Sequence, residues 1–261
     1  MGGIVNRRIL GRTGIEVSEL SIGTGTEGYG HSSQQTRLGR DELSRLLRFA
    51  YDSGITFWDA ADGYGSHEAL GMALKGLRRD TVEITSKTTS RTPAAIREDV
   101  HRFCRELGTD YIDILMLHCL TQHNWPTRYA DCMDEMTRLK EEGLIRAVGC
   151  SCHDFTALKL TSECPWVEVN LARINYGGKH MDASPDEVIP VLRKMHADGK
   201  GLYGMKVLGQ GSLARDPERA IEFVLNLGCV DAITIGMTSD DQVRRNIAII
   251  ERLTGALARA A

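Results

Sequence analysis

The chain has 261 residues, of which 42% are hydrophobic and 26% are charged, and its formal net charge is −3. This composition is that of a globular protein with enough apolar material for a large buried core. Lys and Arg are scattered, and there is neither an apolar run of about 18 residues nor a secretory signal, so we expect no nucleic-acid, membrane or secretory role.

The cysteines point to a reducing environment. Seven are present, an odd number, and no two are spaced as Cys-x-x-Cys. This pattern argues against a disulfide framework, a zinc knuckle and an iron–sulfur cluster. Several thiols fall inside apolar, strand-like runs, as buried free cysteines do. We therefore expect a cytoplasmic protein with no metal site.

Along the chain, short apolar runs alternate with amphipathic helical stretches. Residues 8–18 alternate around two glycines, which predicts a hairpin that caps one end of the fold. The strands predicted after it are 20–23, 55–59, 82–87, 111–118, 145–151, 167–174, 202–207 and 232–235. The predicted helices are 41–52, 66–76, 93–107, 129–142, 155–162, 185–198, 217–226 and 240–253.

Strict alternation of strand and helix predicts a parallel sheet covered by helices. Eight repeats fit a closed (β/α)₈ TIM barrel, although a doubly wound open sheet has the same local pattern. No Gly-x-Gly-x-x-Gly motif follows the first barrel strand, so the usual dinucleotide motif of open sheets is missing. We therefore expect a single (β/α)₈ barrel domain over residues 1–261, with an N-terminal hairpin cap and a short C-terminal tail.

Three consecutive predicted strands end in an ionisable residue, namely Asp59, Lys87 and His118. Tyr64 follows Asp59 by five residues. In barrels of this kind the active site forms where the strands end. Each residue alone has an ordinary explanation, such as a helix cap, a solvated lysine, a core histidine or a packing aromatic. Their coincidence at neighbouring strand ends predicts a shared site.

The chemistry of these four side chains is coherent. A phenol with an ordinary pKa of about 10 is a poor proton donor at neutral pH. A nearby ammonium would lower the pKa of Tyr64 by stabilising the phenolate, and Asp59 would hold that ammonium. A neutral His118 would orient a carbonyl oxygen. The set predicts that Tyr64 protonates an oxygen while hydride arrives at carbon.

At these residues the chain resembles the aldo-keto reductase superfamily over almost its whole length. The resemblance lies in RRILGRTGIEVSELSIGTGT, GITFWDAADGYGSHEALGMALKG, EITSK, DYIDILMLH, KEEGLIRAVGCS, EVNLARIN, MKVLGQGSL and AITIGMTSDDQVRRNI. It implies a catalytic tetrad of Asp59, Tyr64, Lys87 and His118. It also implies an NAD(P)H-dependent oxidoreductase acting on a small carbonyl or alcohol substrate, with NADP(H) favoured over NAD(H).

The resemblance implies cofactor contacts as well, and several depart from the family pattern. The family holds the carboxamide with a Ser-Asn pair and a Gln, whereas this chain has Ser151, Cys152 and Leu171. Met205 replaces the usual stacking aromatic. The implied cofactor contacts are Gly23, Thr24, Asp59, Ser151, Met205, Lys206, Leu208, Gly209, Gly236, Met237, Thr238, Gln242 and Asn246.

Cofactor choice depends on the last helix. The family's Lys and Arg that clamp the 2′-phosphate correspond here to Gly236 and Gln242. The helix N-terminus can still hold a phosphate. Arg244 or Arg245 would then supply positive charge, and the neighbouring residues Asp240 and Asp241 oppose it.

The substrate pocket is expected to involve Tyr29, Trp58, His118 and Trp125. The chain stops soon after Asn246, without the C-terminal loop of longer members, which suggests an open or partner-completed pocket. Two other functions are considered. One is a nicotinamide-binding regulatory subunit of the same fold with little turnover, and the other is an unrelated barrel lyase or isomerase with a lysine base.

Overall fold

The computed structural model describes residues 5–260. Its eight barrel strands are β3 (Leu20–Gly23), β4 (Phe57–Asp59), β5 (Glu83–Thr88), β6 (Ile112–Leu120), β7 (Ile145–Cys152), β8 (Val169–Arg173), β9 (Gly201–Met205) and β10 (Ala232–Gly236). They close into a parallel barrel in the order β10-β3-β4-β5-β6-β7-β8-β9. The predicted closed barrel is confirmed, and the open sheet is excluded. The single-domain prediction includes residues 1–4 and 261, which lie outside the described residues.

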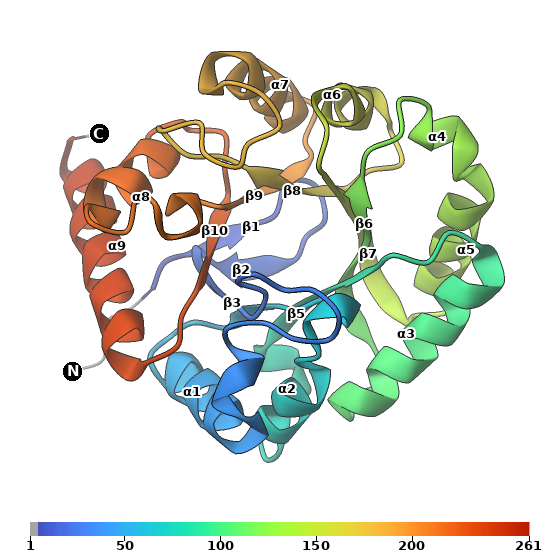
Figure 1. Ribbon diagram of the computed structural model, residues 1–261, viewed down its shortest axis with the longest axis horizontal. Helices are drawn as coiled ribbons and strands as arrows, with labels where there is room; N and C mark the ends of the chain where they lie inside the picture. The colour runs from blue at the N-terminus through green and yellow to red at the C-terminus, as the bar shows by residue number, and fades with distance from the viewer. Residues whose placement is uncertain (1–4, 261) are drawn as a thin grey trace.

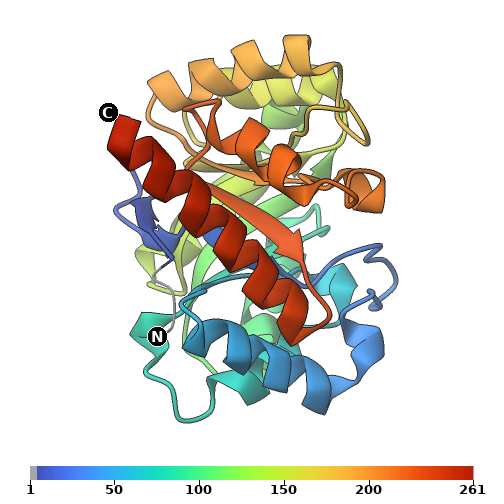
Figure 2. The same cartoon turned by 90° about the vertical axis from the view of Figure 1, so that its left-hand side faces the viewer.

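Helices surround this barrel (Figure 1). They are α1 (Arg40–Asp52), α2 (His67–Leu74), α3 (Pro93–Leu107), α4 (Trp125–Arg128), α5 (Ala130–Glu141), α6 (Phe155–Glu163), α7 (Pro185–Ala197), α8 (Pro217–Leu225) and α9 (Asp240–Ala260). The long α9 packs against α1 and α8 on the outside of the barrel (Figure 2). No helix within residues 5–260 combines the length and the apolar character that a membrane crossing requires.

Most predicted boundaries agree with the structure to within two residues, and local signals explain why. Helix α3 begins after Thr92, whose side chain accepts a hydrogen bond from the backbone N–H of Ala95, and it ends at Gly108 with a φ of 63°. Two predictions were wrong. The short helix α4 was not expected, and α9 continues past residue 253 to Ala260.

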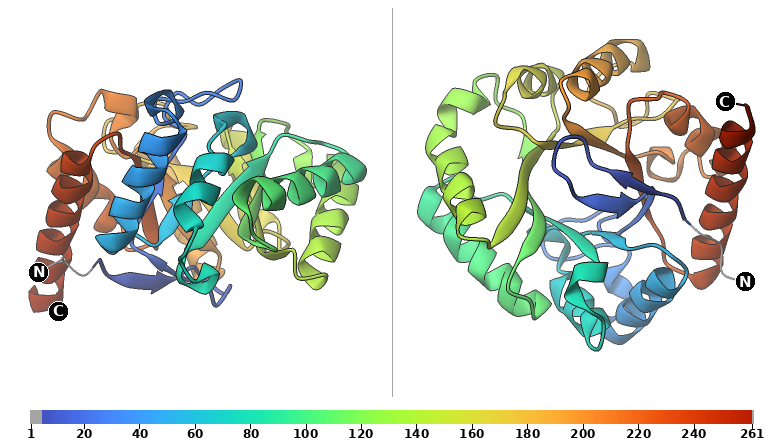
Figure 3. Two further views of the ribbon diagram at one scale, coloured as in Figure 1. Left: turned by 90° about the horizontal axis from the view of Figure 1, so that it is seen from below. Right: turned by 180° about the vertical axis from the view of Figure 1, so that it is seen from behind.

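The predicted hairpin is confirmed and closes one end of the barrel. Its strands β1 (Arg7–Ile9) and β2 (Glu16–Ser18) pair antiparallel, and they lie across the barrel when the molecule is seen from behind (Figure 3). Leu10, Ile15 and Val17 are buried against residues that face the barrel interior. Burial of each such side chain contributes about 1.5–3 kcal/mol, so the hairpin forms the apolar floor of the barrel.

The alternation of side chains along the strands then determines which residues reach the opposite end. Phe57 and Met116 belong to the cluster inside the barrel. Successive side chains of a strand point to opposite faces, so the residues two positions further on, Asp59 and His118, face the interior at its other end. The same rule applies to Lys87 on β5. The fold therefore directs these three side chains into the carboxyl-terminal mouth.

Replacing Gly11 with Ala tests the close contact between hairpin and barrel. Gly11 has a φ of +46°, and a Cβ atom there would lie 2.2 Å from the backbone nitrogen of Gly201. Gly14 has a φ of +71° but open space around the same position, so it is a matched control. We expect urea denaturation to show a loss of unfolding free energy of about 3 kcal/mol for Gly11→Ala and about 1 kcal/mol for Gly14→Ala. Equal losses would contradict the tight contact.

Candidate active site

A buried ion pair joins two of the predicted catalytic residues. Lys87 Nζ lies 2.8 Å from Asp59 Oδ1 and 2.7 Å from the backbone oxygen of Ala60. The Lys87 side chain has no exposed surface, and that of Asp59 is 6% exposed. Burial lowers the pKa of Lys87, and the Asp59 carboxylate opposes this by raising it. The ammonium is therefore fixed by two acceptors at the bottom of the mouth.

Tyr64 and His118 lie above this pair. Tyr64 ends a short 3-10 helix, Asp62–Tyr64, that follows β4. Its ring centroid is 5.0 Å from Lys87 Nζ and 5.7 Å from the centroid of the His118 ring, which it meets edge to face. The structure thus brings all four predicted residues together, although they come from three strands and one loop.

The ionisation of Tyr64 differs from the sequence-based expectation. Burial, followed by the Asp59 carboxylate, raises the pKa of Tyr64 well above its ordinary value. The expected net lowering of this pKa was wrong, because burial and the Asp59 carboxylate both raise it. Tyr64 therefore holds its proton throughout the neutral range.

His118 has the opposite behaviour. Burial and the nearby Lys87 ammonium lower the pKa of His118 well below its ordinary value. Its imidazole is consequently neutral at pH 7, as the expected role in orienting a carbonyl oxygen requires. The mouth thus presents a protonated phenol and a neutral imidazole side by side, above a fixed ammonium–carboxylate pair.

Sequence reasoning missed the loop that holds the Tyr64 ring. A Cβ atom at Gly25 or Gly28 would lie only 2.2 Å or 2.4 Å from atoms of this ring. The same loop is attached to the segment before Tyr64, because the N–H of His31 donates to the oxygen of Gly63 at 2.9 Å. The two glycines allow the backbone between β3 and α1 to lie directly on the phenol ring.

A second missed residue lies beneath the ion pair. The hydroxyl of Tyr203, on β9, donates to Asp59 Oδ1 at 2.8 Å, the same oxygen that accepts from Lys87. Tyr203 is completely buried and its ring packs against Phe57, with centroids 5.1 Å apart. Asp59 is therefore held by donors from two other strands. In the sequence, Tyr203 reads as an ordinary core aromatic.

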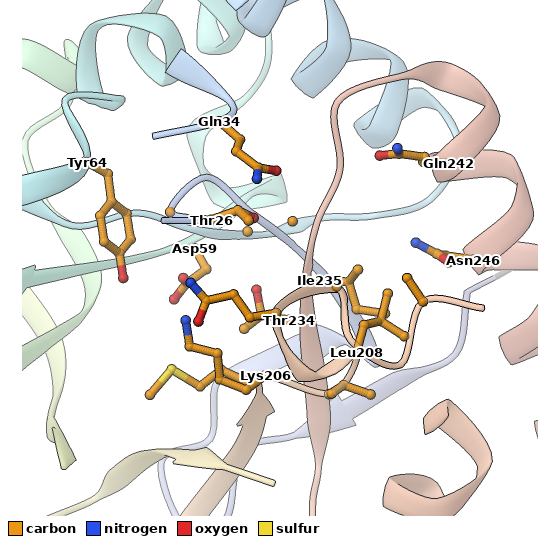
Figure 4. A pocket seen from close by; sticks show the side chains of 18 of the residues that line it. Thr26, Gln34, Asp59, Tyr64, Lys206, Leu208, Thr234, Ile235, Gln242 and Asn246 are labelled. Carbon is orange, nitrogen blue, oxygen red and sulfur yellow. The ribbon is translucent and has the colours of Figure 1, made fainter. Parts of the chain in front are cut away.

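A groove of about 400 Å³ leads from the tetrad toward α9. In Figure 4, Tyr64, Asp59 and Lys206 lie at one end, while Gln242 and Asn246 lie at the other. It is lined by Gly23, Gly25, Thr26, Gln34, Asp59, Tyr64, Met205, Lys206, Val207, Leu208, Gln210, Gly211, Ala214, Thr234, Ile235, Gly236, Gln242, Arg245 and Asn246.

Eight of the thirteen predicted cofactor contacts line this groove, namely Gly23, Asp59, Met205, Lys206, Leu208, Gly236, Gln242 and Asn246. The other five, Thr24, Ser151, Gly209, Met237 and Thr238, are not part of its lining. Thr24 and Ser151 are fully buried. Their hydroxyls are engaged, since that of Thr24 donates to the oxygen of Asp59 and that of Ser151 accepts from the N–H of Cys119.

Two polar side chains of the groove, Thr234 and Asn246, are available to a polar ligand. Thr234 Oγ1 is buried without a hydrogen-bond partner among the described residues, and it lies on the groove wall. Asn246 is 3% exposed and lines the far end. A buried polar group without a partner is costly, so these groups are ready to bind a polar ligand.

Contacts show which charged side chains at the start of α9 are already paired. Arg244 pairs with Asp241 at 3.2 Å, and Asp240 pairs with Arg45 at 2.8 Å. Arg245 lines the groove, and none of the ion pairs of the described residues involves it. The two acidic residues that seemed to oppose a phosphate are therefore each paired with an arginine, and Arg245 is the arginine of α9 that lines the groove.

The predicted substrate contacts of the two tryptophans were wrong. Trp58 and Trp125 are completely buried in the cluster between barrel and helices. Their ring N–H groups donate to the backbone oxygens of Ile55 and Ala157, each at 3.2 Å. Trp58 lies between Phe57 and Asp59, so strand alternation turns it outward, away from the mouth. Tyr29, by contrast, is 89% exposed in the loop beside the site.

Comparison with known proteins agrees with this geometry. The profile of the aldo/keto reductase family matches residues 20–223. The chain belongs to this family.

Two relatives show how far the likeness extends among members of the family. The NADH-specific methylglyoxal reductase of Escherichia coli is 28% identical over 207 residues, which cover 70% of this chain but only 62% of that protein. The L-galactose dehydrogenase of Arabidopsis thaliana is 24% identical, and the match covers 95% of this chain and 89% of that protein. Among solved structures, the holo form of an aldo-keto reductase from Bacillus halodurans has the same fold, with a TM-score of 0.77 and 23% identity over 95% and 91% of the chains.

Tyr203→Phe tests how this aldo/keto reductase holds Asp59. Loss of a buried hydrogen bond to a charged group is expected to cost about 1.5–3 kcal/mol of unfolding free energy. Because Asp59 would then be held by Lys87 alone, we also expect kcat to fall about tenfold with KM little changed.

Tyr51→Phe is the matched control, since its hydroxyl contacts Thr81 Oγ1 at 2.8 Å, away from the mouth. This variant is expected to lose stability without losing kcat. Stability curves and steady-state kinetics of both variants provide the measurement. Equal effects of the two substitutions on kcat would show that Tyr203 only supports folding.

Proposed function

We propose that the protein is an NAD(P)H-dependent reductase of aldehydes or ketones in which Tyr64 is the proton donor. One observation carries this proposal. The buried pair of Asp59 and Lys87 lies with Tyr64 and a neutral His118 at one end of a groove whose far end offers Asn246 and Arg245. Membership of the aldo/keto reductase family supports the same reaction class.

The side chains divide the work of carbonyl reduction between them. The groove lined by Lys206, Arg245 and Asn246 would hold a reduced nicotinamide nucleotide, which would supply hydride for the carbonyl carbon. The neutral His118 donates a hydrogen bond to the carbonyl oxygen and orients it. Tyr64, which retains its proton at neutral pH, transfers that proton to the same oxygen as negative charge develops there. The reverse sequence oxidises the alcohol.

The buried ion pair serves the phenolate that proton transfer leaves behind. Lys87 Nζ lies 5.0 Å from the Tyr64 ring centroid, close enough for its charge to stabilise the phenolate in a buried site. Asp59 and the Ala60 oxygen prevent the ammonium from turning away. The Lys87 ammonium thus offsets part of the cost of forming an anion that burial and the Asp59 carboxylate both disfavour.

For the cofactor we favour NADP(H) over NAD(H). Arg245 faces the groove without an ion-pair partner among residues 5–260, and it lies on the same helix as Asn246. A guanidinium binds phosphate oxygens well, and the N-terminal end of α9 favours negative charge. The E. coli relative is named as specific for NADH, and this specificity belongs to that protein.

A second candidate is a nicotinamide-binding regulatory protein of the same fold with little turnover. It is favoured by the positions where the family holds the carboxamide. Leu171 is buried inside the barrel, and Cys152 contacts Thr161 Oγ1 rather than the groove. The geometry of the tetrad favours the enzyme over this alternative.

All seven cysteines are unpaired. This supports a reducing, cytoplasmic setting for the activity, since disulfides are rare there.

Nucleotide titration followed by turnover tests the proposed function. We expect NADPH to bind with a Kd in the micromolar range, as measured by the quenching of tryptophan fluorescence. With NADPH bound, the protein is expected to reduce members of a panel of aldehydes and ketones. Tyr64→Phe is expected to lower kcat by about 10²-fold or more while nucleotide binding persists, because it removes only the proton donor.

Three outcomes are distinct. Turnover with a Tyr64→Phe variant as active as the parent would refute the assigned donor. Binding without turnover of any carbonyl would favour the regulatory protein. Failure to bind either nucleotide would refute both candidates.

Arg245→Ala tests the preference for NADP(H). Since the 2′-phosphate is the only difference between the nucleotides, we expect the substitution to weaken NADPH binding about tenfold and NADH binding very little. Arg244→Ala is the matched control, because Arg244 is paired with Asp241 and lies over the Phe49 ring. An equal loss for both nucleotides, or a larger effect of Arg244→Ala, would contradict the assignment.

A further inference from the structure

An arginine faces the mouth from the end of β8. Val169 and Leu171 belong to the cluster inside the barrel. Arg173 follows two residues later on the same strand, where it pairs in register with Met205 of the groove lining. Alternation therefore places its side chain on the interior face at the carboxyl-terminal end, near the tetrad. None of the mechanistic steps described above uses this guanidinium.

Arg173 is held in place by Asp182. Its Nε lies 3.1 Å from Asp182 Oδ1, and Nη2 donates to the same oxygen. The two side chains are 14% and 1% exposed. Since both bonds use Nε and Nη2, the remaining guanidinium nitrogen, Nη1, is not engaged by Asp182. The carboxylate thus fixes the orientation of the guanidinium and leaves one edge of it open.

The loop between β8 and α7 links this pair to a second cation. Asn175 Oδ1 accepts from the N–H groups of Gly177 and Lys179, and its Nδ2 donates to the backbone oxygen of Lys206 at 3.0 Å. Lys206 has a φ of 59°, a left-handed conformation that is unfavourable for a lysine. One asparagine therefore holds both the loop that carries Asp182 and the backbone of Lys206.

The Lys206 side chain lines the same groove as Asp59 and Tyr64 (Figure 4). No hydrogen bond or ion pair of the described residues involves its ammonium. Burial is the largest cause that lowers the pKa of Lys206, followed by the charge of Arg173, while Glu27 raises it. Glu27 is itself paired with Arg37 at 3.4 Å. Lys206 is thus a partly buried cation that lacks a close counter-charge.

Both cations act on the residues next to His118. The charges of Arg173 and Lys206 contribute, after burial, to lowering the pKa of His153 to about 4. His153 Nε2 in turn lies 3.6 Å from the Sγ atom of Cys119, the residue that follows His118 in the chain. Arg173 pairs in register with Met205, the residue before Lys206, so the two cations converge at the neighbouring ends of β8 and β9.

From this convergence we propose that Arg173 and Lys206 bind a carboxylate of the substrate, so that the protein acts on carbonyl compounds that also carry an acid group. Two cations minus the charge of Asp182 leave one positive charge, which matches a single carboxylate. The planar edge of a guanidinium suits two carboxylate oxygens. An unpaired, partly buried ammonium carries a cost that a bound anion would offset. The inference rests on the proposed function.

Matched substrates measure the effect of the acid group alone. Three pairs are compared: glyoxylate with methyl glyoxylate, succinic semialdehyde with its methyl ester, and 4-carboxybenzaldehyde with methyl 4-formylbenzoate. In each pair the aldehyde is kept and only the charge changes. We expect the ratio of kcat/KM for acid over ester to exceed about ten in at least one pair.

Substitutions then test whether Arg173 and Lys206 cause this preference for the acid over the ester. Arg173→Gln and Lys206→Gln are each expected to lower it about tenfold, and Arg173→Lys, which keeps the charge, is expected to lower it less. Arg79→Gln is the matched control. It breaks the Arg79–Asp113 pair, which is comparably buried at 18% and 1% exposure but lies at the start of β6, at the opposite end of the barrel. We expect it to reduce stability and leave the ratio unchanged.

Several results would overturn the carboxylate site. They are ratios near one for all three pairs, or an effect of Arg79→Gln on the ratio as large as that of Arg173→Gln. If Lys206→Gln weakens nucleotide binding but leaves the acid-to-ester ratio of kcat/KM unchanged, Lys206 binds the cofactor and is not part of the carboxylate site. If only the carboxylate site is wrong, the protein still binds nucleotide and reduces the esters. If the proposed function is wrong, it neither binds nucleotide nor reduces the acid or the ester of any pair.

Discussion

The contact between Lys87 Nζ and Asp59 Oδ1 is the interaction around which the mouth of the barrel is organised. Removing two charges from water is expensive, and their mutual attraction compensates only when further hydrogen bonds complete the pair. Here the Ala60 oxygen and the Tyr203 hydroxyl provide those bonds. The arrangement requires three strand residues, Asp59, Lys87 and Tyr203, and Ala60 directly after β4 to be in place at once.

The same pair determines the protonation of its neighbours. The Asp59 carboxylate adds to the effect of burial on Tyr64, and the Lys87 ammonium adds to the effect of burial on His118. The two shifts have opposite directions, one upward and one downward, and each keeps its group in the neutral form at pH 7. Burial and the ion pair together therefore keep an acid and a hydrogen-bond donor side by side in their neutral forms over a wider pH range than in water.

Much of this was accessible from the sequence because it depends on local rules. The alternation of strands and helices predicted the barrel, and the ionisable residues at strand ends predicted three members of the tetrad. The same alternation, applied strictly, also turns Trp58 outward between Phe57 and Asp59, so that error came from neglecting a rule rather than from missing information. The start and end of α3 followed equally from Thr92 and Gly108.

Other features depend on contacts between distant segments. The hydroxyl of Tyr203 reaches a carboxylate 144 residues away in the chain. The raised pKa of Tyr64 follows from how deeply the ring is buried, which no spacing reveals. Which of two adjacent arginines faces the groove depends on the rotation of α9 against the barrel. In each case the decisive quantity is set by packing rather than by sequence pattern.

The hairpin that closes the barrel has a consequence for the catalytic cycle. At the end of the barrel opposite Asp59, the buried hairpin side chains Leu10, Ile15 and Val17 close the interior. A phenol that has given up its proton must recover one before the next cycle, and this closed floor gives it no opening to solvent from beneath. Solvent protons must therefore enter by the same opening through which the product leaves, which ties the recharging of Tyr64 to product departure.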